Sequence, residues 1–246
     1  MAEEIGEEEI REENGLQKNY SKEFAGQFRS HMIRVPEIIR AVPGIRVFGK
    51  RIKSLVFSTD VAIIRNIDAD AVLAVYPFTP QPVITQAILG AADVPVFCGI
   101  GGGITRGKRV VNLAMDAEFK GAMGVVVNTP TENETIARVA ETVDIPIIVT
   151  VVSEYEDFQS RLDAGVSFFN VSGAAKTPQI VRRIKEQFPD IPVMATGGPN
   201  DESIRNTIEA GADAICYTPA TNGEIFKQLM DKYRANIAHQ AEEEEP

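Results

Sequence analysis

Short apolar runs alternate with longer mixed segments from about residue 54 onward. The runs are rich in β-branched residues and bounded by Gly, Pro or Asp, as expected of strands covered on both faces. We predict strands over residues 55–58, 71–76, 96–99, 124–127, 147–152, 167–171, 193–196 and 214–217. The segments between them, such as 131–143 and 177–188, have the apolar spacing of amphipathic helices. The pattern therefore predicts an α/β fold of strand–helix units.

A recurring pattern at strand starts sets the number of units. Asp93-Val94-Pro95, Asp144-Ile145-Pro146 and Asp190-Ile191-Pro192 open the third, fifth and seventh predicted strands. Pro is tolerated at a first strand position, where no ladder donor is needed. Each interval between these segments holds two strand–helix units, and eight units repeating in pairs describe a (βα)8 TIM barrel. A doubly wound open sheet is the alternative, but it explains neither the paired repeat nor eight units.

The residues before the first strand predict an N-terminal helical extension of the barrel. Phe24, Phe28, Met32 and Ile33 have helical spacing, and residues 35–46 suggest a second short helix. A loose arm is the alternative. We therefore divide the chain into an acidic tail over 1–15, a helical segment over 16–53 that covers the bottom of the barrel, the barrel over 54–236, and an acidic tail over 237–246.

Two helix starts carry the signature of a capping box. Thr131 is followed by Glu134, and Thr221 is followed by Glu224. In such a box the hydroxyl and the carboxylate satisfy each other's backbone N–H groups.

The net charge of −10 comes from the two ends of the chain. Residues 1–13 carry seven Glu and one Arg, and residues 242–245 are four Glu. Without these eleven Glu and Arg11, the 35 acidic and 25 basic residues of the whole chain fall to 24 of each. A neutral body argues against nucleic acid or an anionic membrane as the main ligand.

The remaining composition points to a reducing compartment and away from histidine chemistry. Cys98 and Cys216 lie inside apolar runs without CxxC spacing, which indicates reduced core thiols. His31 and His239 lie outside the periodic body, so we expect no metal site and no Ser-His or Cys-His catalysis. We find no apolar run near the ~18 residues of a membrane span and no secretory leader, and expect a cytoplasmic protein.

In a (βα)8 barrel the active site forms at the carboxyl ends of the strands. Gly197 and Gly198 follow the seventh predicted strand directly and let a ligand approach the backbone. Their N–H groups, with those of the helix that begins near Gly223, can cradle a phosphate. A simple tight turn is the alternative for the two glycines.

The segment over residues 192–217 resembles the seventh and eighth units of the ribulose-phosphate-binding barrel superfamily, which includes aldolases and sugar-phosphate epimerases. It also resembles the corresponding part of FMN-binding barrels. The resemblance covers about 25 residues and implies that Gly197 and Gly198 hold a ligand phosphate. It departs from the superfamily at Thr218-Pro219-Ala220-Thr221, where a glycine turn is usual. Because Pro219 has no N–H, the other half of the phosphate site falls to Thr218, Thr221, Asn222 or Gly223, or is absent.

Two carboxylates are the candidate proton-transfer groups. Asp60 and Glu154 follow the first and fifth strands, which stand opposite each other in an eight-stranded ring. Asn128 and Asn170 end the fourth and sixth strands and are candidate donors to a substrate oxygen. The alternatives are a helix N-cap for Asp60, a solvated surface residue for Glu154, and water-mediated Mg²⁺ binding by both.

A glycine loop and two cations complete the candidate site. Gly101, Gly102 and Gly103 follow the third strand and permit close ligand approach, and Arg106 lies just beyond them. Schiff-base chemistry is disfavoured because no strand ends in Lys, and Lys176, in the loop after the sixth strand, is its one candidate.

These features predict an enzyme that acts on a small, sugar-phosphate-like metabolite by proton transfer, as an isomerase, an epimerase or a lyase without a Schiff base. The alternatives are an FMN-binding oxidoreductase, a phosphate-ester hydrolase and a non-catalytic ligand-binding or assembly barrel. We predict no cofactor, with FMN or Mg²⁺ as alternatives. The expected ligand is a phosphorylated small molecule. The expected protein partner, if the chain assembles, is a second copy of itself in a homo-oligomer.

Overall fold

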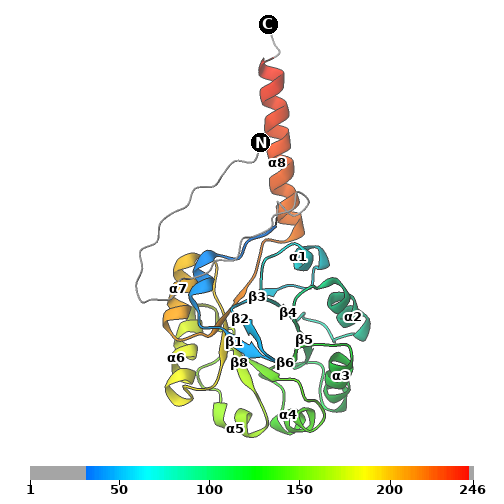
Figure 1. Ribbon diagram of the computed structural model, residues 1–246, viewed down its shortest axis with the longest axis vertical. Helices are drawn as coiled ribbons and strands as arrows, with labels where there is room; N and C mark the ends of the chain where they lie inside the picture. The colour runs from blue at the N-terminus through cyan, green and yellow to red at the C-terminus, as the bar shows by residue number, and fades with distance from the viewer. Residues whose placement is uncertain (1–31, 244–246) are drawn as a thin grey trace. The chain divides into compact units, whose positions relative to one another are not determined.

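The computed structural model describes residues 32–243 and contains a closed barrel of eight parallel strands (Figure 1). The strands run around the barrel in the order β10-β3-β4-β5-β6-β7-β8-β9. They are β3 (Ser54–Phe57), β4 (Ala71–Ala74), β5 (Val96–Gly101), β6 (Gly124–Asn128), β7 (Ile147–Val151), β8 (Phe168–Val171), β9 (Val193–Thr196) and β10 (Ala214–Tyr217). The predicted (βα)8 barrel is confirmed.

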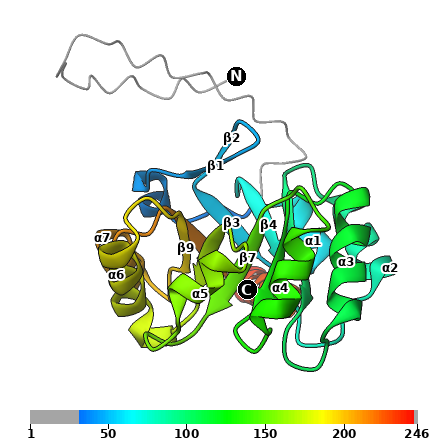
Figure 2. The ribbon, with the colours of Figure 1, turned by 90° about the horizontal axis from the view of Figure 1, so that it is seen from below.

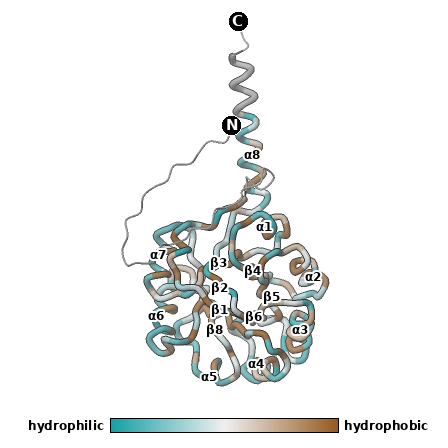
Figure 3. Tube along the Cα trace, in the orientation of Figure 1, coloured by the Kyte–Doolittle hydropathy of each residue, from teal (hydrophilic) through white to brown (hydrophobic). Residues whose placement is uncertain are grey.

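Helices surround the barrel and carry apolar stretches beside polar ones along the trace (Figure 3). Those around the barrel are α1 (Val61–Arg65), α2 (Pro82–Ala91), α3 (Lys108–Phe119), α4 (Asn133–Ala140), α5 (Phe158–Asp163), α6 (Thr177–Gln187) and α7 (Asp201–Glu209), with 3-10 helices η2 (Glu37–Ala41) and η3 (Ala174–Lys176). Helix α8 (Asn222–Glu243) extends away from the barrel (Figure 1). Helix α8 continues through residues 237–243, a stretch that the sequence analysis assigned to an acidic tail. Within residues 32–243 no helix combines the length and apolar composition that a membrane span requires.

One of the two predicted capping boxes forms. Thr221 and Glu224 exchange hydrogen bonds at the start of α8. The Thr131–Glu134 box is wrong, because α4 begins at Asn133 and the buried Thr131 hydroxyl has no hydrogen-bond partner. A carbonyl contact holds Thr131 instead: its backbone oxygen accepts from Arg161.

The barrel interior is apolar through its lower and middle layers. Inward-facing side chains of successive strands form one buried cluster, which includes Leu55, Leu73, Phe97, Ile148, Phe168 and Met194. The Phe97 and Phe168 rings meet edge to face with centroids 6.3 Å apart. Side chains one position along each strand face outward into a second cluster with the helices.

A hairpin closes the amino-terminal mouth of the barrel (Figure 2). Strands β1 (Ile45–Val47) and β2 (Lys50–Ile52) pair antiparallel, and their three apolar side chains belong to the interior cluster. Phe48 and Gly49 turn the chain with φ of 46° and 80°. The helical segment predicted over 16–53 is therefore wrong over 45–52, where buried Ile45 and Val47 flank exposed Arg46 in the alternation of a strand. Residues up to 31 lie outside the described part of the chain.

The segment before the hairpin covers the seam between the first and last barrel strands. Val35 and Ile39 are buried, and η2 contacts α7. Ile33 forms a parallel bridge with Ile67, just after α1. This is the position that the eighth helix takes in a regular (βα)8 barrel. Four large apolar side chains of α8 are 43–65% exposed instead, namely Phe226, Leu229, Met230 and Tyr233.

Candidate functional site

The interior becomes polar at the carboxyl mouth of the barrel. Two positions beyond the apolar layer, the inward-facing residues of four strands are Asn128, Thr150, Asn170 and Thr196. The strand register aligns Thr150 with both asparagines. Asn170 is 4% exposed, and its Nδ2 donates to Thr150 Oγ1 over 3.0 Å. This polar layer includes both predicted asparagines.

The two thiols are protonated core groups rather than nucleophiles. Burial raises the pKa of Cys216 to about 12, and its Sγ donates to Asn170 Oδ1 over 3.5 Å. Burial, with the nearby Asp116 carboxylate adding to it, raises the pKa of Cys98 to about 12. Cys98 packs in the cluster between strands and helices. Neither thiol therefore supplies a thiolate near neutral pH.

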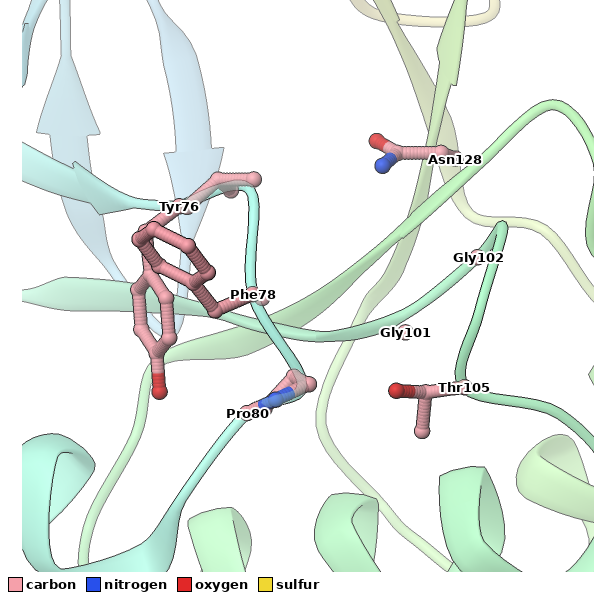
Figure 4. Close-up of a pocket in the computed structure, with 9 residues that line it drawn as sticks. Tyr76, Phe78, Pro80, Gly101, Gly102, Thr105 and Asn128 are labelled. Atoms are coloured by element: carbon pink, nitrogen blue, oxygen red, sulfur yellow. The ribbon is translucent and has the colours of Figure 1, made fainter.

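A hollow opens at the carboxyl ends of β4, β5 and β6 (Figure 4). It is a shallow hollow, and the space of about 300 Å³ between its walls includes open solvent at its mouth. We call it the β4–β6 hollow, and it is lined by Val75, Tyr76, Phe78, Pro80, Gly99, Gly101, Gly102, Thr105 and Asn128. Two of the predicted loop glycines and one predicted asparagine thus share one wall.

The glycine loop needs a residue without a side chain where it passes β6. Gly102 has φ of 110°, and a Cβ there would lie 2.8 Å from the backbone nitrogen of Asn128. Its N–H donates to the Thr105 carbonyl over 3.2 Å, which folds the loop back on itself. Gly103 lies farther out, where its carbonyl accepts from Arg106 Nε over 2.8 Å. Arg106 is exposed and lies outside the lining of the hollow.

Thr105 is a site residue that the sequence reasoning missed. It is 3% exposed, and its hydroxyl has no hydrogen-bond partner in the structure. Figure 4 shows this oxygen directed into the hollow. The side-chain amide of Asn128 points there too and forms no hydrogen bond within residues 32–243. Only the folded loop buries Thr105, so a local sequence pattern carries no signal for it.

Asp60 is engaged on both carboxylate oxygens. Oδ1 accepts from the Ala62 and Ile63 amides over 2.9 and 3.3 Å, which caps α1. Oδ2 accepts from Asn222 Nδ2 over 2.7 Å, which ties the start of α8 to the same cap. Asp60 is therefore the N-cap of α1, as the alternative interpretation of the sequence expected.

Glu154 and Lys176 lie together on the loops that follow β7 and β8. The Glu154 side chain is 15% exposed, and Lys176 Nζ lies 3.9 Å from its Oε1. Gln179 Nε2 donates to Oε2 over 2.6 Å. No contact between Glu154 and Asp60 is found in the described part of the chain. The structure thus pairs Glu154 with a cation rather than with the other predicted carboxylate.

We call the predicted phosphate site, formed by Gly197, Gly198 and the start of α8, the phosphate corner. One of its two glycine amides after β9 has no hydrogen-bond acceptor among the described residues. Gly197 is buried, and its N–H donates to the Cys216 carbonyl over 3.2 Å. Gly198 has φ of 88°, and no acceptor for its amide is found among residues 32–243. Asn200 and Ser203 form a capping box directly after it, at the start of α7.

The other half of the corner is partly occupied by the chain itself. The Thr221 amide and hydroxyl donate to Glu224 Oε2 over 2.7 and 2.8 Å. These bonds, the amide's first, hold the pKa of Glu224 below its usual range. The Gly223 amide has no acceptor within the described residues, and Thr218 is exposed. The Gly198 and Gly223 amides are therefore both open.

No group of three or more His, Cys, Asp or Glu side chains is placed to hold a metal ion in the part of the chain that the structure covers. The polar layer and the hollow offer amides and hydroxyls, and Glu154 lies on the loop that follows β7.

Comparisons with known proteins place the fold. No family model matches the chain. The thiamine-phosphate synthase of Geobacillus thermodenitrificans (strain NG80-2) is 28% identical over 100 residues, which are 36% of this chain and 45% of that enzyme. The match therefore spans less than half of the relative's length.

Solved structures align over more of the chain at lower identity. A phosphonopyruvate hydrolase in complex with oxalate and Mg²⁺ superposes with a TM-score of 0.58 and 13% identity, over 78% of this chain and 83% of that chain. The thiamine phosphate pyrophosphorylase of Pyrococcus furiosus gives 0.52 and 19%, over 67% and 84%. The chain is a (βα)8 barrel, as its resemblance to ribulose-phosphate-binding barrels implies, and it shares that fold with these enzymes.

Proposed function

We propose that this barrel is an enzyme that acts on a small phosphorylated metabolite by proton transfer at its carboxyl mouth. The polar layer carries the proposal. A layer built for stability alone would be apolar, like the one below it, because a buried amide without a partner is destabilising. Asn128 remains unpaired at the top of the barrel, where substrates bind in this fold.

The open backbone amides support a phosphorylated ligand. Gly198 and Gly223 each precede or begin a helix, and the positive end of a helix favours an anion. The partial relative is a thiamine-phosphate synthase, an enzyme named for a phosphorylated compound. In the proposal these two amides hold the phosphate, and the Asp60–Asn222 contact positions Gly223.

The proton step follows from the remaining groups. Glu154 takes a proton from the carbon next to a carbonyl and returns it to the same carbon, to its neighbour, or to a leaving group. Lys176 Nζ lies 3.9 Å from Glu154 Oε1 and so places a cation beside this group. Asn128 donates to the carbonyl oxygen as negative charge develops there. Epimerases, isomerases and lyases share this enediolate step.

Exchange of substrate hydrogen with solvent tests the class of reaction without knowledge of the product. Ribulose 5-phosphate and dihydroxyacetone phosphate are incubated with the protein in D₂O, beside their unphosphorylated forms, and examined by NMR. We expect deuterium uptake only in the phosphorylated compounds, and its loss in Glu154→Gln. Binding without any uptake would favour the non-catalytic barrel.

Two additions test the cofactor alternatives. Repeating the exchange with EDTA and with Mg²⁺ tests water-mediated metal binding by the carboxylates. An absorbance spectrum of the purified protein tests the FMN-binding alternative, since bound flavin gives a visible band.

A further inference from the structure

We propose that the β4–β6 hollow binds a flat, uncharged, amide-bearing ring. This inference deepens the proposed function and rests on it for the identity of the molecule, because the ring would be the part of the substrate that lies away from the phosphate. The claim that such a ring binds the hollow stands on the hollow's own residues.

The walls of the hollow suit a flat group. Tyr76, Phe78 and Pro80 line one side, across from Asn128 and Thr105 (Figure 4). Phe78 is 70% exposed, although burial would stabilise a ring of this size. The Tyr76 hydroxyl accepts from the Gln81 amide over 2.8 Å, so that this ring is held in place. An aromatic ligand stacked here would cover the Phe78 ring.

The polar groups of the hollow suit an uncharged amide. The Thr105 hydroxyl is buried, unpaired and directed into the hollow. A hydroxyl can both donate and accept, which matches the carbonyl or the N–H of an amide. No Lys, Arg, Asp, Glu or His lines the hollow within residues 32–243. A charged ligand group would therefore lack a counter-charge there.

The position of the hollow implies a ligand with two ends. Strand β5 is four strands from β9 in both directions around the ring, so that the hollow and the Gly198 corner are diametrically opposed. Eight strands about 4.8 Å apart and tilted by about 36° close into a ring roughly 15 Å across. A ligand that reaches both ends needs a linker of several atoms between ring and phosphate. Glu154, which follows β7, lies between the two ends on one side of the ring.

Paired probes test the hollow directly. Nicotinamide and nicotinate share one ring and differ in the amide against a carboxylate, and uracil is a second neutral amide ring. Saturation-transfer NMR measures their binding to the full chain at millimolar concentration. We expect nicotinamide and uracil to bind and nicotinate to bind at least tenfold more weakly. Equal binding of nicotinamide and nicotinate, or no binding of either neutral ring, overturns the proposal.

Two matched variants locate the binding. Thr105→Val removes the hydroxyl in the hollow, and Thr131→Val removes the other unpaired buried hydroxyl, which lies outside its lining. Both are expected to fold, with a melting temperature equal to or above that of the wild type, because each removes an unsatisfied polar group. We expect about tenfold weaker nicotinamide binding in Thr105→Val alone. An unchanged affinity in Thr105→Val, or an equal loss in both, overturns the proposal.

The outcomes separate this inference from the proposed function. Nicotinamide binding that depends on Thr105, without deuterium exchange in any sugar phosphate, supports the hollow and contradicts the proton-transfer chemistry. Deuterium exchange without binding of either neutral ring supports the chemistry and contradicts the hollow.

Discussion

The Asn222 side-chain amide donates to Asp60 Oδ2 over 2.7 Å and so joins the start of the last helix to the cap of the first. The two residues are 162 positions apart in the chain. With Oδ1 capping α1 and Oδ2 bound to Asn222, both carboxylate oxygens of Asp60 have a structural role.

Replacing Asp60 separates this task from catalysis. Asp60→Ala is expected to lower the free energy of unfolding by about 1–2 kcal/mol, as loss of an N-cap does. Asp60→Asn keeps a good cap, and a flip of the Asn222 amide restores the second hydrogen bond, so that stability and deuterium exchange should stay near wild type. Urea unfolding and the exchange assay measure the two effects. Abolished exchange in a stable Asp60→Asn would instead make Asp60 a catalytic base.

Gly198 is expected to be sensitive both to a side chain and to charge. Its φ of 88° and a Cβ only 2.5 Å from Ser203 Oγ predict that Gly198→Ala costs more than the roughly 1–2 kcal/mol of the left-handed conformation alone. Gly121→Ala is the control, with φ of 90° and no atom within 4 Å of its Cβ. Gly198→Asp should also abolish binding of a sugar phosphate, measured by calorimetry. Unchanged affinity there would remove the phosphate corner from the proposal.

Substitution of Arg161 is expected to lower the free energy of unfolding more than substitution of an exposed ion-pair partner. It is 9% exposed, pairs with Glu156 over 2.7 Å, and donates to the Thr129 and Thr131 carbonyls. Arg161→Met leaves the Glu156 carboxylate, only 11% exposed, without its cation, and should cost up to about 3–5 kcal/mol in urea unfolding.

An exposed pair provides the comparison for Arg161. Arg138 and Glu134 lie 2.6 Å apart, but their side chains are 51% and 73% exposed. Arg138→Met should change the free energy of unfolding by less than about 1 kcal/mol. Similar losses in Arg161→Met and Arg138→Met would contradict the importance given to burial.

The buried thiols predict a loss of stability at high pH. Burial raises the pKa of Cys216 from 9.0 to about 12, so the folded state holds the proton more tightly than the unfolded state. The contribution is complete below pH 9 and is lost as pH rises from 9 through about 12. Cys216→Ala should show a smaller drop than wild type across this window in urea unfolding. A thiol reagent at pH 8 should label neither cysteine until the protein unfolds, and rapid labelling of the native protein would contradict this.

The fold was predictable because the determining signals repeat. Asp-x-Pro recurs at alternate strand starts, and each strand is short enough to be bounded by Gly, Pro or Asp. The hairpin over 45–52 was missed because three residues on each side of a turn give too short an alternation to distinguish from a helix. Its identity depends on the interior cluster that it completes.

The site was predictable only in part. Residues at strand ends follow from the architecture, so the sequence places Asn128 and Asn170 at the mouth, and their catalytic role stays a prediction. The partners of the two carboxylates were not predictable, because the Glu154–Lys176 and Asp60–Asn222 contacts join loops that are distant in the sequence. Thr105 and Thr131 show the same limit, since an unpaired hydroxyl is a property of burial rather than of sequence spacing.

The segment before the hairpin, which covers the junction of the first and last barrel strands, has a consequence for the order of folding. Val35 and Ile39 leave the ribosome early, whereas α7, which contacts η2, is made near the end of synthesis. The nascent chain therefore carries an uncovered apolar segment until α7, directly before the last strand, is made. Closure of the barrel and burial of Val35 and Ile39 therefore occur together, late in folding. Exposure of these two side chains would then mark a barrel that has not yet closed.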